Sequence, residues 1–207
     1  MSCILCTFTL CYVHFRTSNH LCTYVFWLKT KNKHTTNALT LIVDLYRSEN
    51  LLRIAVNHQP HSTIVADNLN LPHPDSFFDF AISIAVVHHL STPERRVQAI
   101  QEILRTLRPG SQENPGGRAL IYVWALEQKS SRRGWDKGDN QDVMVPWVLK
   151  SGSSKGDSND PPKTFHRYYH LYEESELERD IGSAGGRVLE SGYEKDNWWA
   201  IATRSNE

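Results

Sequence analysis

Two apolar segments that end on polar side chains constrain the fold of this chain more than any other feature. Residues 62–66 and 78–86 are almost continuously apolar, and polar residues follow each of them: Asp67 after the first, His88 and His89 after the second. Such runs are typical of strands buried on both faces, as in a parallel sheet. Ligands bind open α/β sheets beyond the carboxyl ends of the strands. The sequence therefore predicts a site at that edge, lined by an acid and two histidines.

The segments around these two runs predict an alternation of strands and helices. Residues 38–45 and 118–125 are short apolar runs typical of strands, and residues 48–57 have an amphipathic pattern typical of a helix. Ser91 and Glu94 have the spacing of a capping box. Apolar residues then recur at helical intervals: Val97, Ile100, Ile103, Leu104 and Leu107. This order predicts an α/β fold with a parallel-dominated sheet.

Residues 128–164 differ in composition from the rest of the chain. They are rich in Gly, Ser, Asp and Lys, which predicts an excursion from the sheet that is partly ordered and partly a flexible linker. A helix through residues 173–182 and a closing pair of strands at residues 186–194 and 197–204 are expected after it.

Charge and cysteine content narrow the function classes. The formal net charge is zero, so binding to nucleic acid would need a local basic patch rather than bulk attraction. All four cysteines lie within residues 3–22, and the body has the composition of a reduced, intracellular protein. Cys3 and Cys6 form a C-x-x-C pair, but no second pair follows with zinc-finger spacing, so no metal site is predicted. No apolar run approaches the roughly 18 residues of a membrane span.

The N-terminal segment lacks a sustained strand or helix pattern, and we expect residues 1–37 to be irregular. Within them, residues 22–28 (CTYVFWL) have strand propensity, which leaves open whether they occupy a strand position in the sheet.

Several motifs resemble one enzyme family. The strings A-D-N-L-N-L-P (residues 66–72) and F-D-F-A (residues 78–81) are similar to motifs of class I S-adenosylmethionine-dependent methyltransferases. The strings ISIAVVHH, SSRRGW, QDVMVPW and RYYHLY more narrowly resemble the eukaryotic tRNA methyltransferases that methyl-esterify 5-carboxymethyluridine at the wobble position. That family includes fungal enzymes and the methyltransferase domain of the animal AlkB-type tRNA protein. The resemblance covers residues 47–204 and implies a Rossmann-like fold.

The resemblance implies a donor, an acceptor and a set of site residues. The donor is S-adenosylmethionine, and the acceptor carboxylate, with a pKa near 4, needs no general base. The candidate cofactor-binding residues are Asp67, Asn68, Ile84, Ala85 and Asp44. His88 and His89 are the candidate catalytic residues, as the lining of the methyl-transfer pocket, although a histidine at a strand end also serves in packing.

The candidate tRNA-binding residues are Arg132, Arg133, Trp124, Tyr168, Tyr169 and His170. Basic clusters also occur as solvated surface, and single aromatic residues more often belong to the core, so both interpretations stay open. The resemblance further implies tRNA as a partner, a small zinc-binding activator subunit that covers an apolar sheet edge, no membrane, and a cytoplasmic location with the nucleus as a second.

The chain departs from the family at its N-terminal side. The family has a strand that ends in a glycine-rich loop, whereas the first glycine here is Gly110. Tyr46 stands where the family has the acid that binds the cofactor ribose, and Asp44 lies two residues earlier. We therefore expect residues 1–46 to be a non-homologous segment, derived from a mis-assigned exon or translated intron, ahead of a methyltransferase domain at 47–207 that lacks its first strand.

Three functions are compatible with this pattern. The first is a tRNA wobble-uridine carboxyl methyltransferase, impaired by the altered N-terminal segment. The second is a class I methyltransferase for a small molecule, and the third is a catalytically dead scaffold that keeps a tRNA-binding or partner-binding surface.

Overall fold

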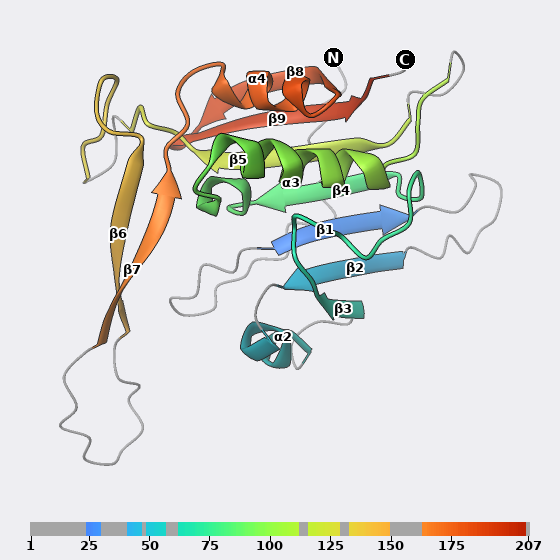
Figure 1. The fold of residues 1–207 in the computed structure, drawn as a ribbon, viewed down its shortest axis with the longest axis horizontal. Helices are drawn as coiled ribbons and strands as arrows, with labels where there is room; N and C mark the ends of the chain where they lie inside the picture. Colours follow the sequence, from blue (N-terminus) through green and yellow to red (C-terminus); the bar gives the residue numbers. More distant parts are fainter. Residues whose placement is uncertain are drawn as a thin grey trace.

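The computed structural model describes residues 24–29, 41–46, 49–56, 62–111, 116–128, 133–149 and 163–205. The main sheet has seven strands: β1 (Tyr24–Lys29), β2 (Leu41–Tyr46), β3 (Ser62–Val65), β4 (Phe80–Ile84), β5 (Arg118–Trp124), β8 (Gly186–Glu194) and β9 (Asn197–Arg204). A separate hairpin consists of β6 (Asp142–Leu149) and β7 (Lys163–His170). The helices are α2 (Glu49–Val56), α3 (Pro93–Thr106), α4 (Glu176–Ser183) and the short 3₁₀ helix η2 (Val87–His89). Figure 1 shows their arrangement.

The main sheet has the strand order β3-β2-β1-β4-β5-β9-β8, whose first five strands follow the 3-2-1-4-5 order of doubly wound nucleotide-binding folds. Five strands run in one direction, while β1 and β9 run against them. The predicted α/β Rossmann-like class is therefore confirmed. Because β1 and β9 run in the reverse direction, most pairs of neighbouring strands in the sheet are nevertheless antiparallel.

Strand β1 corrects one expectation. Residues 1–37 were expected to be irregular and the first strand to be missing, but Tyr24–Lys29 form a strand between β2 and β4. Its direction follows from chain length, because residues 30–40 are too few for the crossover that a parallel neighbour requires. Lys29 accordingly pairs with Leu41, and Tyr24 lies beside Ile84. The amino end of β1 thus lies at the ligand-binding edge.

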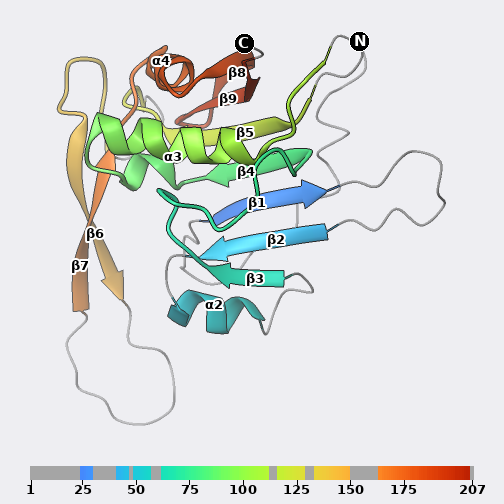
Figure 2. The same cartoon turned by 45° about the vertical axis from the view of Figure 1, so that its right-hand side comes forward.

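Helix α3 covers the core, as its apolar spacing predicts. Its buried side chains include Ile100, Ile103 and Leu104, which pack against β4, β5 and β9 in one cluster. Both α3 and α4 lie on the same face of the sheet (Figure 2). The predicted cap at Ser91 is wrong by one residue: Thr92 Oγ1 accepts the Arg95 N–H at 3.4 Å. Pro93 explains the shift, because proline is favoured at the first helical position.

The β6–β7 hairpin lies beyond the carboxyl ends of β4 and β5 (Figures 1 and 2). Its base docks through a small apolar cluster of Leu126, Val145, Tyr169 and Leu171. The excursion predicted for residues 128–164 therefore contains a strand. Among the described residues, no helix combines the length and apolarity needed to cross a membrane.

Candidate functional site

The carboxyl end of β4 turns sharply into the candidate site. Ala85 has a φ of 58°, a left-handed conformation that is uncommon for a residue with a Cβ and is found at functional sites. Its N–H donates to the Tyr122 carbonyl of β5 at 3.2 Å. This turn ends the strand and directs η2, with both predicted histidines, over the end of β5.

His88 is fully buried and neutral. Its Nδ1 accepts the backbone N–H of Trp124 at 3.0 Å, so the ring carries its proton on Nε2. That buried Nε2 has no hydrogen-bond partner among the described residues. Burial, together with nearby His89 and His170, holds the pKa of His88 well below its usual value. The site therefore contains an uncharged N–H donor.

His89 has the opposite tautomer. Its Nδ1 lies 2.9 Å from the Tyr168 carbonyl, which can only accept, so Nδ1 carries the proton. Burial lowers the pKa of His89; the Tyr168 carbonyl opposes this shift and Arg167 adds to it. Its ring centroid is 4.4 Å from that of Tyr169. Both histidines are thus held neutral and in fixed orientations.

Aromatic side chains extend this site toward the hairpin. The Trp124 and Tyr169 rings stack with centroids 4.3 Å apart and an interplanar angle of 13°. Arg133 lies with its Cζ 5.8 Å from the Trp124 centroid and 5.4 Å from that of Trp135. Arg132 lies outside the described residues.

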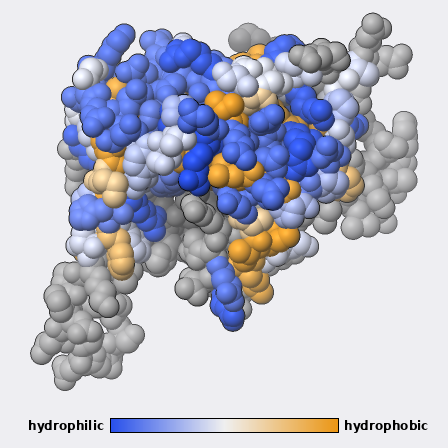
Figure 3. Space-filling model, in the orientation of Figure 1, coloured by the Kyte–Doolittle hydropathy of each residue, from blue (hydrophilic) through white to orange (hydrophobic). Residues whose placement is uncertain are grey.

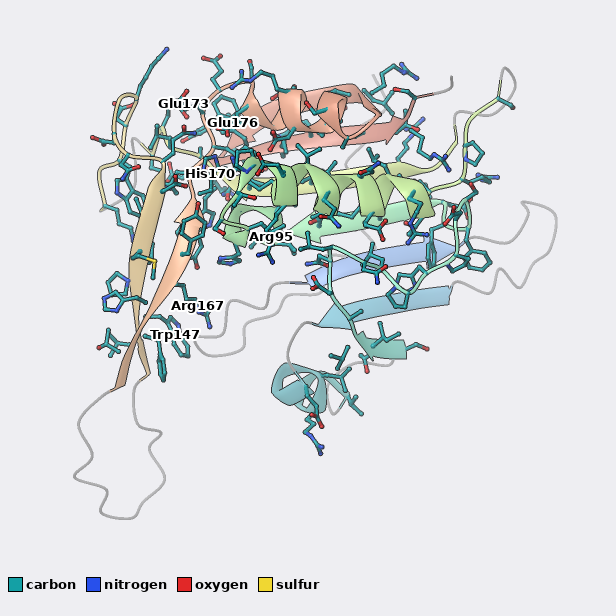
Figure 4. The ribbon with its side chains drawn as sticks, in the orientation of Figure 1. Arg95, Trp147, Arg167, His170, Glu173 and Glu176 are labelled. Atoms are coloured by element: carbon teal, nitrogen blue, oxygen red, sulfur yellow. The ribbon has the colours of Figure 1, made fainter. Side chains whose placement is uncertain are left out.

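His170 and Tyr168 serve to dock the hairpin. His170 is 5% exposed, and its two ring nitrogens lie 2.9 Å from Asp142 Oδ1 and 2.7 Å from Glu176 Oε1 (Figure 4). Burial alone would lower the pKa of His170, but these two carboxylates raise it. The Tyr168 hydroxyl also donates to Asp142, and burial with this bond raises the pKa of Tyr168 to about 12. This arrangement places His170 inside the protein.

The network continues to a buried arginine that sequence reasoning missed. Arg96 of α3 is 4% exposed and lies 3.6 Å from Glu176 and 3.7 Å from Asp180. Its position among the apolar residues of α3 was the available signal, because a buried arginine needs acidic partners. The network links β6, β7, α3 and α4 behind the histidines.

The residues after β3 form the other side of the site. Asp67 Oδ1 accepts the Leu69 N–H at 3.1 Å in a tight turn, and Asn68 Oδ1 is buried without a partner among the described residues. Ile84, at the end of β4, is 38% exposed. Asp44 pairs through its backbone with Phe26 and Thr63. The unpaired acceptor of Asn68 and the exposed Ile84 side chain fit the adenine side of a nucleoside cofactor.

The glycine cradle that would receive the rest of such a cofactor does not follow β1. Since β1 is reversed, its carboxyl end at Lys29 lies at the opposite edge of the sheet. Within the described residues, no group of three or more His, Cys, Asp and Glu side chains is placed to hold a metal ion. The four cysteines, at which no metal site was predicted, lie outside them.

Comparisons with known proteins agree with this geometry. A methyltransferase domain family matches residues 31–112. The chain is 45% identical over 168 residues to a Schizosaccharomyces pombe tRNA (carboxymethyluridine(34)-5-O)-methyltransferase, covering 77% of this chain and 70% of that protein. It is 40% identical over 217 residues to the Saccharomyces cerevisiae protein of the same name, covering 79% and 76%. A crystal structure of an S-adenosylmethionine-dependent methyltransferase from Clostridium acetobutylicum matches with a TM-score of 0.56 at 11% identity, covering 78% of this chain and 74% of that one.

Proposed function

Because this chain belongs to the family of tRNA (carboxymethyluridine(34)-5-O)-methyltransferases, we propose that it methylates the carboxylate of 5-carboxymethyluridine at the tRNA wobble position. The observation that carries this proposal is the pair of neutral histidines beyond the carboxyl ends of β4 and β5. Their pKa values are lowered, so neither ring places a positive charge beside the acceptor carboxylate.

The histidines act as positioning groups in this proposal. The acceptor carboxylate is already ionised at neutral pH, so a proton acceptor would add nothing. Charge on the carboxylate decreases as the ester forms, and a cationic group held against it would stabilise the starting state more than the transition state. In this proposal the partly buried ring of His89 lines the methyl-transfer pocket, and the fully buried ring of His88 packs against it. The two neutral rings exclude water and orient the acceptor without that cost.

We propose S-adenosylmethionine as the donor, which supplies an electrophilic methyl group when bound. Asp67 and Asn68 would hold the adenine side, with Ile84 against the ring and the Ala85 backbone beside it. Asp44 would replace the missing ribose-binding acid only if the register of β2 shifted. Binding is therefore expected to be weak.

We propose that Arg133 and Arg132 contact tRNA.

We also propose that an activator subunit binds this chain by adding a strand to β3, and that the complex acts in the cytoplasm. Strand β3 forms one end of the main sheet, and an edge strand offers unpaired backbone groups to a partner. Val65 of β3 is 45% exposed and Val56 of α2 is 55% exposed. Figure 3 shows apolar side chains gathered over this edge.

The function is tested by methyl transfer to two tRNAs that differ only at the wobble base, one with 5-carboxymethyluridine and one with unmodified uridine. The reaction contains S-adenosylmethionine and the activator subunit. We expect an ester only with the carboxylated tRNA. The Val65→Asp variant should lose activation, whereas Leu189→Asp on the opposite edge strand β8 should keep it. Methyl transfer to the unmodified tRNA at the same rate, or none to the carboxylated tRNA, would contradict the proposal.

A scaffold function is the second candidate, because no glycine precedes Gly110 and β1 runs in the reverse direction, so the glycine cradle of the family is missing. Isothermal titration with S-adenosylmethionine separates the two functions. A scaffold gives no heat with the cofactor while it still binds tRNA, and an enzyme gives heat even when the affinity is low.

A further inference from the structure

The outer half of the β6–β7 hairpin carries exposed apolar side chains that the core does not use. Met144 is 58% exposed, Val148 is 50% and Phe165 is 49%. Figure 3 shows apolar side chains on this part of the hairpin, and Figures 1 and 2 show that it stands away from the main sheet. Exposed apolar side chains that gather on one projecting element mark a contact surface.

Strand register divides these side chains between two faces. Trp147 pairs with Phe165, and Val145 pairs with Arg167. Because opposite residues of antiparallel strands share a face and neighbours alternate, these four residues and Tyr169 lie on one face. Met144 and Val148 lie on the other.

The first of these faces begins at the candidate site. Tyr169 touches His89 and stacks on Trp124. Burial raises the pKa of Tyr169, and Arg167 opposes this rise through its charge and a hydrogen bond. The Arg167 Cζ then lies 4.7 Å from the Trp147 ring centroid, and the Trp147 and Phe165 rings are 6.1 Å apart. The side chains of Tyr169, Arg167, Trp147 and Phe165 form a continuous row, which we call the hairpin row. Tyr169, only 3% exposed, is its buried inner end, and the accessible part of the row consists of Arg167, Trp147 and Phe165.

The chemistry of this row fits unpaired nucleotides. Aromatic rings and guanidinium planes stack on splayed bases, and the cation also attracts phosphate. Asp142 is the single acidic residue of β6 and β7 and pairs with His170, which places it on the other face of the hairpin. The face of the row carries Arg167 and no carboxylate that would repel a polyanion. From Arg167 to Phe165 a strand extends about 7 Å, at about 3.3 Å per residue. Stacked bases are about 3.4 Å apart, so the accessible part of the row has room for about two nucleotides.

We propose that the hairpin row binds unpaired anticodon-loop nucleotides that flank the wobble uridine, and so holds that uridine over the histidines. This inference rests on the proposed function and adds a specific subsite to it. Trp147 and Phe165 supply the stacking surfaces, and Arg167 joins them to the site.

Binding of the full-length chain to two RNAs tests the inference. One is an anticodon stem–loop with 5-carboxymethyluridine, and the other is a continuous duplex of equal length without unpaired bases. Trp147→Ala should weaken stem–loop binding about 5- to 150-fold, the range produced by loss of one base stack, and should leave duplex binding unchanged. Trp147→Phe should retain most of the affinity. Met144→Ala is the matched control, because Met144 is exposed on the same strand but faces the other way.

The other outcomes are equally informative. If wild type and Trp147→Ala bind the stem–loop equally, the inference is wrong while the proposed function stands. Equal weakening for both RNAs would also overturn it, because duplexes offer no unpaired bases. Changed sedimentation or activator binding with unchanged RNA affinity would assign the row to a protein partner instead. Failure of the wild-type chain to bind the stem–loop would remove both proposals.

Discussion

At the residue scale, the contributions of two buried histidines to the free energy of unfolding change with pH in opposite directions. His170 bridges two carboxylates and has a raised pKa. His88 is fully buried against His89, Trp124 and Tyr169, and burial lowers its pKa. Protonation is favoured by folding at His170 and disfavoured at His88. The free energy of unfolding therefore has one contribution of each sign.

At His170, stabilisation is fully present below the unfolded pKa of about 6.5 and is lost as pH rises through the higher folded pKa. We expect His170→Gln to lower the free energy of unfolding by about 1.5–3 kcal/mol at low pH, because it removes hydrogen bonds to charged partners. The loss should be smaller at alkaline pH. Urea unfolding at several pH values measures this, with the exposed His166→Gln of the same strand as control. A pH-independent loss would contradict the raised pKa of His170.

At His88, the unfolded chain takes up a proton below about pH 6.5 that the folded chain excludes, so stability falls as the pH drops. His88→Asn should reduce this loss of stability at acidic pH, because the amide oxygen can still accept the Trp124 N–H but does not titrate. The measurement is the slope of unfolding free energy between about pH 5 and 6.5. Nuclear magnetic resonance should show a His88 ring that does not titrate in that range; titration near the unfolded value would refute the assignment.

At the scale of single elements, the start of α3 gives a sharp test, because sequence and structure assign different caps. Thr92→Ala should lower the free energy of unfolding by about 0.5–1 kcal/mol, the lower part of the range for lost N-caps, since its bond to Arg95 is long at 3.4 Å. Ser91→Ala should have little effect. Thermal unfolding of both variants measures the difference, and the reverse ranking would restore Ser91 as the cap.

Local sequence patterns predict those strands and helices whose buried face can be recognised from the spacing of their own apolar residues. Strands β3, β4 and β5, helix α3 and the closing pair β8 and β9 all fall close to their predicted ranges. Residues 22–28 have strand propensity, but the place and direction of β1 could not be predicted, because they depend on an opening between β2 and β4 that only the assembled sheet defines. The Arg96 network was missed for the same reason: its carboxylates come from segments far away in sequence.

The candidate site likewise contains residues that the sequence could place and residues that it could not. The strand ends at Asp67 and Ala85 could be placed from sequence, because strand ends are local features. The role of His170 could not, since a histidine between two carboxylates looks like any other histidine until α4 and the hairpin meet.

At the scale of the whole molecule, the reversed β1 predicts weak cofactor binding. We expect a chimera in which residues 1–46 are replaced by a family-like strand, glycine loop, helix and second strand ending in Asp to bind S-adenosylmethionine at least about tenfold more tightly. Hydrogen bonds to a charged acceptor contribute about 1.5–3 kcal/mol each, and each 1.4 kcal/mol is tenfold in affinity. Titration calorimetry measures both proteins, and equal affinities would show that the present N-terminal segment holds the cofactor by another route.

The direction of β1 also limits how this chain could evolve or be engineered. Substitutions change side chains but keep the length of residues 30–40, which join β1 to β2. These eleven residues are fewer than the dozen or more that a parallel neighbour requires. A mutagenesis library of point changes would therefore search only among antiparallel first strands. Libraries that lengthen the connection, or that supply a competing strand for the same position, are the ones in which a parallel first strand becomes accessible.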